Sequence, residues 1–130
     1  MIMRGRVIFR GTVKGEALVS TEAISFYGGV DPTTGVITEK GHPLEGKSIK
    51  GKILVFPQGK GSTVGSYILY RLKKNGVAPL GIINKECDTV VAVGAIISEI
   101  PLIDKLDVDP IKNIKTGQFV EINENKVIVR

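Results

Sequence analysis

The fold of this chain is decided by residues 53 to 84, which read ILVFPQGKGSTVGSYILYRLKKNGVAPLGIIN. The apolar run Ile53–Phe56 predicts a strand, and the glycine-rich segment Pro57–Gly61 predicts a loop after it. A helix is expected from about Ser62 to Gly76, and a second strand over Leu80–Asn84. These elements predict a βαβ unit, in which a right-handed helical crossover joins two parallel strands.

The expected helix has recognisable ends and one apolar face. Lys73 and Lys74 lie in its last turn, where cations interact favourably with the helix dipole. Gly76 suits the position just after a helix. The face that we expect to be buried carries four side chains at helical spacing, which are Val64, Tyr67, Ile68 and Leu72.

Ser62 is the leading candidate for a functional residue, because a glycine-rich turn delivers it to the start of the helix. Unpaired N–H groups and the helix dipole favour negative charge on a side-chain oxygen at this place. Gly59 and Gly61 allow unusual backbone angles and a close approach, and Thr63 and Ser66 add hydroxyl groups to an anion-binding or catalytic turn. The alternative is that Ser62 only caps the helix. The glycine spacing, Gly-x-Gly-x-x-x-Gly, is not the dinucleotide-binding fingerprint.

Length and composition predict a single domain spanning residues 1–130. The chain has 130 residues, of which 42% are hydrophobic and 24% charged, as in soluble globular proteins. No apolar run approaches the roughly 20 residues of a membrane span, and the first residues lack the apolar core of a signal peptide. We therefore expect a cytoplasmic protein with no membrane partner.

Charge and cysteine content limit the partners and the metal chemistry. The net charge is +5 and the pI about 9.4, yet the cations are scattered and do not alternate with aromatic residues. An anionic substrate or an acidic partner is expected rather than a nucleic acid. Cys87 is the single cysteine, which excludes an internal disulfide and a metal cluster held by this chain's thiolates alone. We expect it to be a small packed hydrophobe and expect no metal ligand in this chain.

Strands are expected at both ends of the chain. Gly5–Arg10 and Ala17–Ser20, split by Gly15, are predicted to form a half-buried antiparallel pair. Gln118–Ile122 and Lys126–Val129 are predicted to form a hairpin, with the three residues between them at its tip. The fold class is therefore α/β, with a mixed barrel-like sheet in which both termini pair and a βαβ unit in the middle.

Two other segments leave alternatives open. Asp88–Ile97 is apolar and fits either a short helix or a strand, and Asp109-Pro110 marks a turn in the polar stretch that follows. Thr21–Ser48 contains many turn signals. A loop of this length inside a compact domain usually has a function, so this region is the second candidate site.

Candidate motifs within that loop are each weighed against a simpler explanation. Gly41–Ser48 matches the P-loop pattern, but a turn and a strand follow it instead of a helix, and Pro43 disturbs the nest of N–H groups. His42, the only histidine, is either structural or catalytic; it has no sequence partner for a metal site, and no G-x-S-x-G elbow of a serine hydrolase occurs. Asp31 is either a turn residue before proline or part of a loop that faces a substrate or another subunit.

A set of linked motifs runs through the first three quarters of the chain. The motifs are LVSTEAISFYGGVDP at residues 18–32, GHPL at 41–44, GKILV at 51–55, GKGSTVGS at 59–66 and VGAII at 93–97, followed by Ile100-Pro101. Together they resemble the small subunit of the aconitase X family. Thr63 stands where a second serine is expected, and it keeps the hydroxyl group.

The resemblance implies a swivelling β/β/α domain, like the mobile domain of aconitase. It also implies a heterodimer with a large subunit that carries an iron-sulfur cluster of the 4Fe–4S type. The activity implied is that of a hydro-lyase, active only with the large subunit, which removes water from (R)-5-phosphomevalonate in the archaeal mevalonate route to isoprenoids. The alternatives are another hydroxy acid, such as cis-3-hydroxyproline, or a non-catalytic swivelling domain that binds a partner.

The same resemblance suggests roles for individual residues. Ser62 would be the base that takes the α-proton, while an iron with an open position would pull off the hydroxyl group. Lys60 would help to hold a carboxylate or phosphate. The loop from Gly28 and Gly29 to Asp31, together with His42, would line the same cleft.

Overall fold

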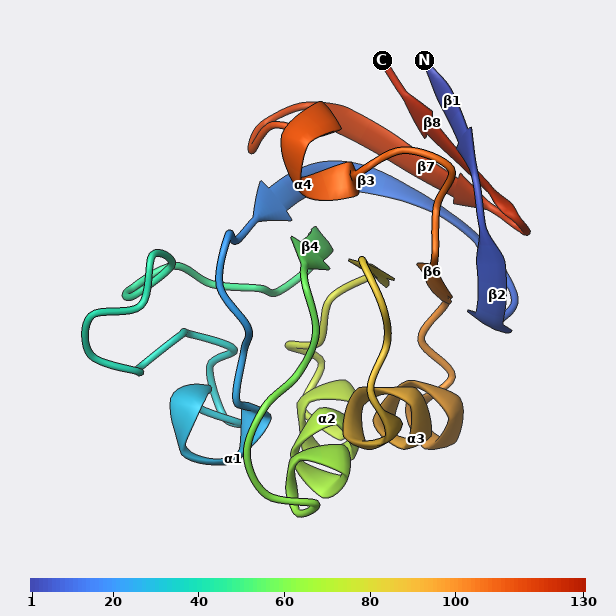
Figure 1. Cartoon of the computed structure of the whole chain (residues 1–130). Helices are drawn as coiled ribbons and strands as arrows, with labels where there is room; N and C mark the ends of the chain where they lie inside the picture. The colour runs from blue at the N-terminus through green and yellow to red at the C-terminus, as the bar shows by residue number, and fades with distance from the viewer.

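The computed structural model of the chain describes residues 1–130 and contains one curved sheet, with three of the four helices on one side of its central strands and the short C-terminal helix on the other (Figure 1). The strands are β1 (Ile2–Arg4), β2 (Arg6–Phe9), β3 (Thr12–Val19), β4 (Ile53–Phe56), β5 (Gly81–Asn84), β6 (Leu102–Asp104), β7 (Phe119–Asn123) and β8 (Lys126–Val129). The helices are α1 (Phe26–Gly29), α2 (Gly65–Lys74), α3 (Thr89–Ser98) and α4 (Pro110–Asn113). None of these helices is long and apolar enough to cross a membrane.

The sheet curls into a barrel-like shape because of its strand order, β1-β8-β7-β3-β4-β5-β6-β2. β1 and β2 follow one another in the chain with only Gly5 between them, yet they are the two ends of this order. The sheet therefore has to bend until its two edges almost meet. The prediction of a mixed barrel-like sheet that includes both termini is confirmed, since β1 pairs with β8.

The central βαβ unit is also confirmed. β4 and β5 are parallel neighbours, in register from Ile53 opposite Gly81 to Phe56 opposite Asn84. Every residue of both strands is buried, because helices cover one face of this part of the sheet and the barrel interior covers the other. In β4, Leu54 and Phe56 belong to the core beneath the helices, whereas Ile53 and Val55 belong to the core inside the barrel.

The predicted pairing of the first two strands is wrong. β2 pairs with β6, while β3 pairs with β7 on one side and with β4 on the other. β3 also runs straight through Gly15, and β1 was not predicted at all. At Gly15 an added Cβ would lie 3.0 Å from the Leu80 side chain, so this glycine makes room for a neighbour and does not end the strand.

The helix of the βαβ unit begins later than predicted, at Gly65 instead of near Ser62. Its buried face contains Ile68 and Leu72 as expected, but Leu69 takes the place of Tyr67 and Val64, which are exposed. The reason is that α2 packs against α3 as well as against the sheet, which turns its inner face. Gly76 follows the helix with a φ of +71°, as the sequence predicted.

The segments that remain contain a helix, a hairpin and a short capped helix. The ambiguous region 88–97 forms a helix, α3, whose N-cap is Asp88. The C-terminal hairpin is confirmed, with Asn123 paired to Lys126 so that its tip is Glu124-Asn125. Asp109 caps the short helix α4, whose first residue is Pro110.

Candidate functional site

The loop between β4 and α2 is fixed by its neighbours on both sides. The Gly59 N–H donates to Asp88 Oδ1 at 2.7 Å, which ties the loop to the start of α3. The Lys60 N–H donates to the Ile24 carbonyl at 3.1 Å, and the Ile24 N–H donates to Gln58 at 3.2 Å. A single parallel bridge between Ile24 and Gly59, together with the bond to Asp88, therefore fixes the loop between the α3 cap and the segment before α1.

Two glycines make this close packing possible. A Cβ on Gly59 would lie 2.5 Å from Val91 Cγ2, a separation that real side chains do not reach. Gly61 has a φ of +90°, and a Cβ there would lie 2.7 Å from Ser25 Oγ. Both positions thus require glycine, Gly59 for space and Gly61 for space and backbone angle.

Ser62 follows this loop and is exposed. Its Oγ accepts a hydrogen bond from the Val64 N–H at 3.1 Å, and its carbonyl accepts one from the Gly65 N–H at 3.0 Å. It therefore caps the tight turn that leads into α2, whereas the cap of the helix proper is Val64. A backbone N–H that points at an exposed hydroxyl oxygen stabilises negative charge on that oxygen.

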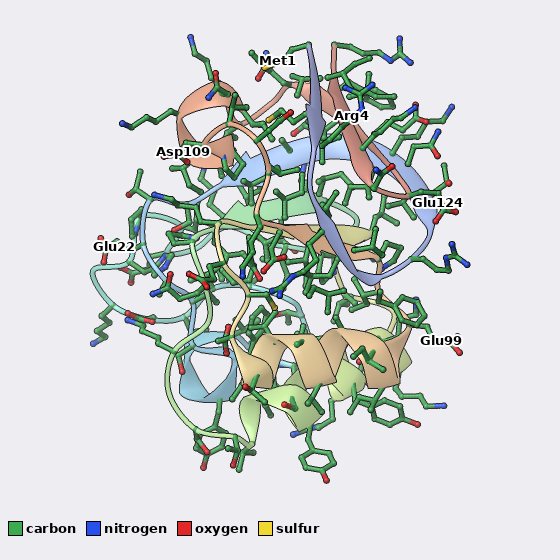
Figure 2. All side chains as sticks on the ribbon, turned by 45° about the vertical axis from the view of Figure 1, so that its right-hand side comes forward. Met1, Arg4, Glu22, Glu99, Asp109 and Glu124 are labelled. Atoms are coloured by element: carbon green, nitrogen blue, oxygen red, sulfur yellow. The ribbon has the colours of Figure 1, made fainter.

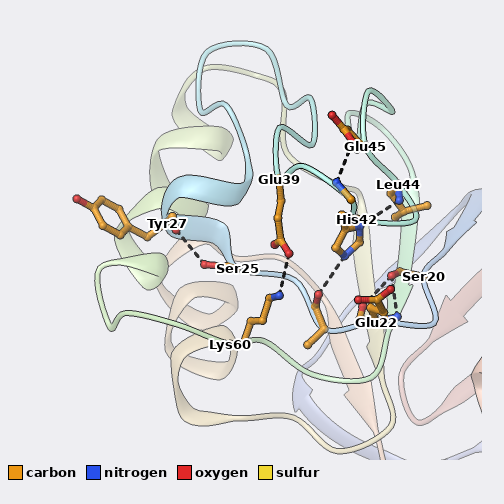
Figure 3. Close-up of polar contacts among 11 residues, drawn as sticks. Ser20, Glu22, Ser25, Tyr27, Glu39, His42, Leu44, Glu45 and Lys60 are labelled. Carbon is orange, nitrogen blue, oxygen red and sulfur yellow. Dashed lines mark hydrogen bonds and ion pairs between the residues drawn. The ribbon is translucent and has the colours of Figure 1, made fainter.

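A shallow cleft of about 400 Å³ lies beside this turn. Its lining brings together two of the predicted loops, and consists of Ser25, Tyr27, Gly28, Gly29, Glu39, Lys60 and Gly61. Lys60 Nζ reaches across to Glu39 Oε2 at 2.8 Å (Figure 3). The cleft therefore holds one exposed cation, paired with one carboxylate, close in the chain to Ser62.

His42 is not part of this cleft lining. Its ring is buried, Nδ1 accepts from the Leu44 N–H at 3.0 Å, and Nε2 lies 3.0 Å from the Ala23 carbonyl (Figure 3). An acceptor role for Nδ1 places the proton on Nε2, which donates to Ala23. Nε2 thus joins two segments of the long loop and Nδ1 closes a local turn, which corresponds to the structural alternative for this residue.

Asp31 also lies outside the cleft lining. Its Oδ1 accepts from the Thr33 N–H at 2.8 Å, and its carbonyl accepts from the Gly35 N–H at 2.8 Å. These two bonds close a turn around Pro32 and Thr34. The side chain therefore has the geometry of the turn residue that the sequence offered as the simpler interpretation.

The two hydroxyl residues after Ser62 face the neighbouring helix. Ser66 is buried, and its Oγ donates to the Val90 carbonyl at 2.7 Å, which locks α2 against α3. Thr63 is exposed and lines a groove between these helices. Neither residue lines the cleft that contains Lys60.

Sequence reasoning missed two residues of this region. Asp88 connects the loop to α3 through Gly59 and also accepts from the Val91 N–H at 3.3 Å. An aspartate directly before an apolar helix is a recognisable N-cap, so this signal was present in the sequence. Glu39 had no such signal, because its partner Lys60 is 21 residues away and only the fold brings them together.

The chain does not offer ligands for an iron-sulfur cluster. Cys87 is half-buried, and burial with the nearby Asp88 and Asp104 carboxylates raises its pKa to about 12, so it remains a thiol. The structure contains no group of three or more His, Cys, Asp or Glu side chains placed to hold a metal ion. The residues of this chain do not fit an iron-sulfur cluster, which the resemblance places on the large subunit.

Comparisons with known proteins agree with this architecture. The family model for the aconitase X swivel domain matches residues 2–130. The phosphomevalonate dehydratase small subunit of Methanosarcina acetivorans is 60% identical over 93% of this chain and 84% of its own length, and that of Thermococcus sibiricus is 55% identical over 97% and 95%. In the crystal structure of Thermococcus kodakaraensis aconitase X in its holo form, a chain with 48% identity superposes with a TM-score of 0.95, covering 100% of this chain and 98% of that one.

Proposed function

The chain belongs to the aconitase X swivel domain family, and we propose that it is the small subunit of a phosphomevalonate dehydratase. The observation that carries this proposal is that proteins between 50% and 60% identical to it, over nearly the whole chain, have that name. The reaction would remove water from (R)-5-phosphomevalonate and give trans-anhydromevalonate 5-phosphate. A cytoplasmic location and a place in isoprenoid biosynthesis belong to the same proposal.

In this reaction Ser62 acts as the base that takes the proton from the α-carbon. A serine hydroxyl is a weak base in water, so it needs donors that stabilise the alkoxide and a site without bulk water. The Val64 N–H, 3.1 Å from Ser62 Oγ, is one such donor at the start of a helix. Ser62 is exposed in the free chain, so exclusion of water requires closure against a second protein.

Lys60 holds an anionic group of the substrate in the cleft beside Ser62. Its side chain is 46% exposed, and its Nζ lies 2.8 Å from Glu39 Oε2. A carboxylate or phosphate can share or replace this partner, because the ammonium group has three donors. Gly28, Gly29 and Gly61 leave the cleft shallow, which lets a second protein complete it.

The second protein in this proposal is a large subunit that carries the iron-sulfur cluster. A cluster iron with an open position supplies a Lewis acid for the departing hydroxyl group. This chain then contributes the base, the substrate-binding cation and the surface that closes over the site.

The test is reconstitution of the two-chain enzyme. The chain is co-expressed with its large subunit, the cluster is reconstituted without oxygen, and phosphomevalonate is followed by NMR. We expect product only when both chains are present. Turnover by the large subunit alone would mean that this chain supplies no catalytic group. A cluster-loaded complex that leaves phosphomevalonate unchanged would reject the substrate, and cis-3-hydroxyproline would then test the other branch of the family.

A further inference from the structure

Helix α3 is a surface helix without a charged residue. Its sequence, TVVAVGAIIS, lies in a chain of which 24% is charged, and carboxylates occur only at its two caps, Asp88 before it and Glu99 after it (Figure 2). Its inner side, including Val91 and Ala95, is buried, but Val93, Ile96 and Ile97 on its outer side are exposed. A helix that meets water normally carries charged or polar side chains on its outer face, so this face is typical of a helix that another protein covers.

Helix α2 extends the same surface. Of the twelve large hydrophobic side chains that are exposed, half lie on or directly before these two helices, which shows that they are concentrated and not scattered. We call this set the α2–α3 apolar surface, and it consists of Val64, Tyr67, Tyr70, Val93, Ile96 and Ile97. Aromatic and aliphatic residues without charges are the composition of the core of a protein–protein interface.

A groove of about 430 Å³ crosses this surface between the two helices. Its lining has no charged residue and includes Thr63, Tyr67, Thr89, Val90 and Val93. The floor is closely packed, because Ser66 Oγ is bonded to the Val90 carbonyl at 2.7 Å and a Cβ on Gly94 would lie 2.5 Å from Leu69. A groove whose shape is already fixed costs little to order when a partner side chain enters it.

We propose that the α2–α3 apolar surface is where this chain docks its large subunit, with a large aliphatic or aromatic side chain of that subunit in the groove. This inference rests on the proposed function, which supplies the partner. The groove lining includes Thr63, directly after Ser62, so the surface borders the residue that has to meet a substrate held by the large subunit.

The charges of this chain argue against a second copy of it as the occupant. The last turn of α2 adds Arg71, Lys73 and Lys74 at the edge of the surface, and the chain has a net charge of +5. Two copies would bring like charges together, whereas a partner with an acidic rim would be attracted. The occupant therefore combines an apolar centre with an acidic rim.

The experiment measures binding of the large subunit to variants of this chain. Val93→Glu places a charge at the groove, and Val108→Glu is the matched control, since the two valines are 43% and 40% exposed and Val108 lies between β6 and α4. Each variant is titrated against the immobilised, cluster-loaded large subunit, and its melting temperature is recorded alone. We expect Val93→Glu to raise the Kd at least tenfold and Val108→Glu to change it less than threefold, with the melting temperature of each isolated chain retained.

Three results would overturn the proposal. Wild-type affinity of Val93→Glu and of a second variant, Ile97→Glu, would place the interface elsewhere. An equal loss of affinity in Val108→Glu would mean that the effect is general and not local. If light scattering finds the isolated chain dimeric and Val93→Glu monomeric, with unchanged affinity for the large subunit, the surface binds a second copy. Because binding is measured without substrate, a complex that forms through Val93 but leaves phosphomevalonate unreacted would reject only the proposed function.

Discussion

Two glycine-rich loops of this molecule end in a serine with the same local geometry, yet they differ in what surrounds that serine. In the loop 41–48, Ser48 Oγ accepts from the Lys50 N–H at 3.2 Å; in the loop 59–62, Ser62 Oγ accepts from the Val64 N–H at 3.1 Å. Ser48 leads into a turn and then strand β4, whereas Ser62 leads into helix α2. Only the second hydroxyl therefore lies where a helix contributes positive potential.

The two loops also differ in how many of their polar side-chain groups are already hydrogen-bonded within the chain. In the first loop both nitrogens of His42 are bonded, and Glu45 accepts from the Gly41 N–H at 3.0 Å. In the second loop the backbone is fixed, but the Ser62 hydroxyl and the Lys60 ammonium group remain accessible. The comparison teaches that a serine after glycines is a candidate for chemistry where the fold leaves it exposed at the start of a helix.

The largest expected difference between the loops is in catalysis. Ser62→Ala in the two-chain enzyme should lower kcat by roughly a thousandfold, since it removes the base, while Ser48→Ala should leave kcat unchanged. The measurement is the initial rate of phosphomevalonate dehydration at saturating substrate. If Ser62→Ala turns over near the wild-type rate, Ser62 only caps the turn and is not the base. The two loops would then not differ in catalysis.

The next largest effect should be on stability, in the first loop. His42→Ala removes two hydrogen bonds and leaves a buried gap, so we expect the free energy of unfolding to fall by about 2–4 kcal/mol. Urea denaturation followed by circular dichroism measures this change. The folded, assembled variant should keep its kcat, and a large loss of kcat with unchanged stability would instead place His42 in the site.

Two glycine variants test how strongly the backbone of each loop is constrained. Gly61→Ala and Gly41→Ala both place a side chain at positive φ, +90° and +80°, but only the former brings its Cβ within 2.7 Å of Ser25 Oγ. We expect a loss of about 1 kcal/mol for Gly41→Ala and about 2–3 kcal/mol for Gly61→Ala. Thermal melts should then separate the two variants by roughly 5 °C. Equal melting temperatures would show that the loop moves away from Ser25 at little cost.

The smallest effect concerns substrate binding. Lys60→Met should raise the KM about fivefold, or ~1 kcal/mol, with a modest change in kcat, because it removes a cation that holds a substrate anion. Lys47→Met, which changes an exposed lysine of the first loop, is the matched control and should leave KM unchanged. The same KM for both variants would mean that the anion is held by other residues.

The sequence predicted those elements of the fold that depend on residues close together in the chain. The βαβ unit, the hairpin 118–129 and the capping glycine Gly76 each depend on apolar periodicity or turn chemistry within a short window. The pairing of β2 with β6, across about a hundred residues, has no local signal. The same holds within the site, since the Gly59–Ser62 loop was found from its glycines while the Glu39–Lys60 pair was not.

The sequence by itself determined that residues 53–84 form a strand, a glycine-rich loop, a helix and a parallel strand, and that Ser62 follows the loop, whereas the helix start at Gly65 came from the structure. The tertiary structure alone decided which polar groups remain available. His42, Asp31 and Ser66 have their side chains bonded to backbone groups that lie close only after folding or after a turn closes. The physical reason is that residue type fixes what a group can donate or accept, whereas burial and partners from distant segments fix whether it is still free to do so.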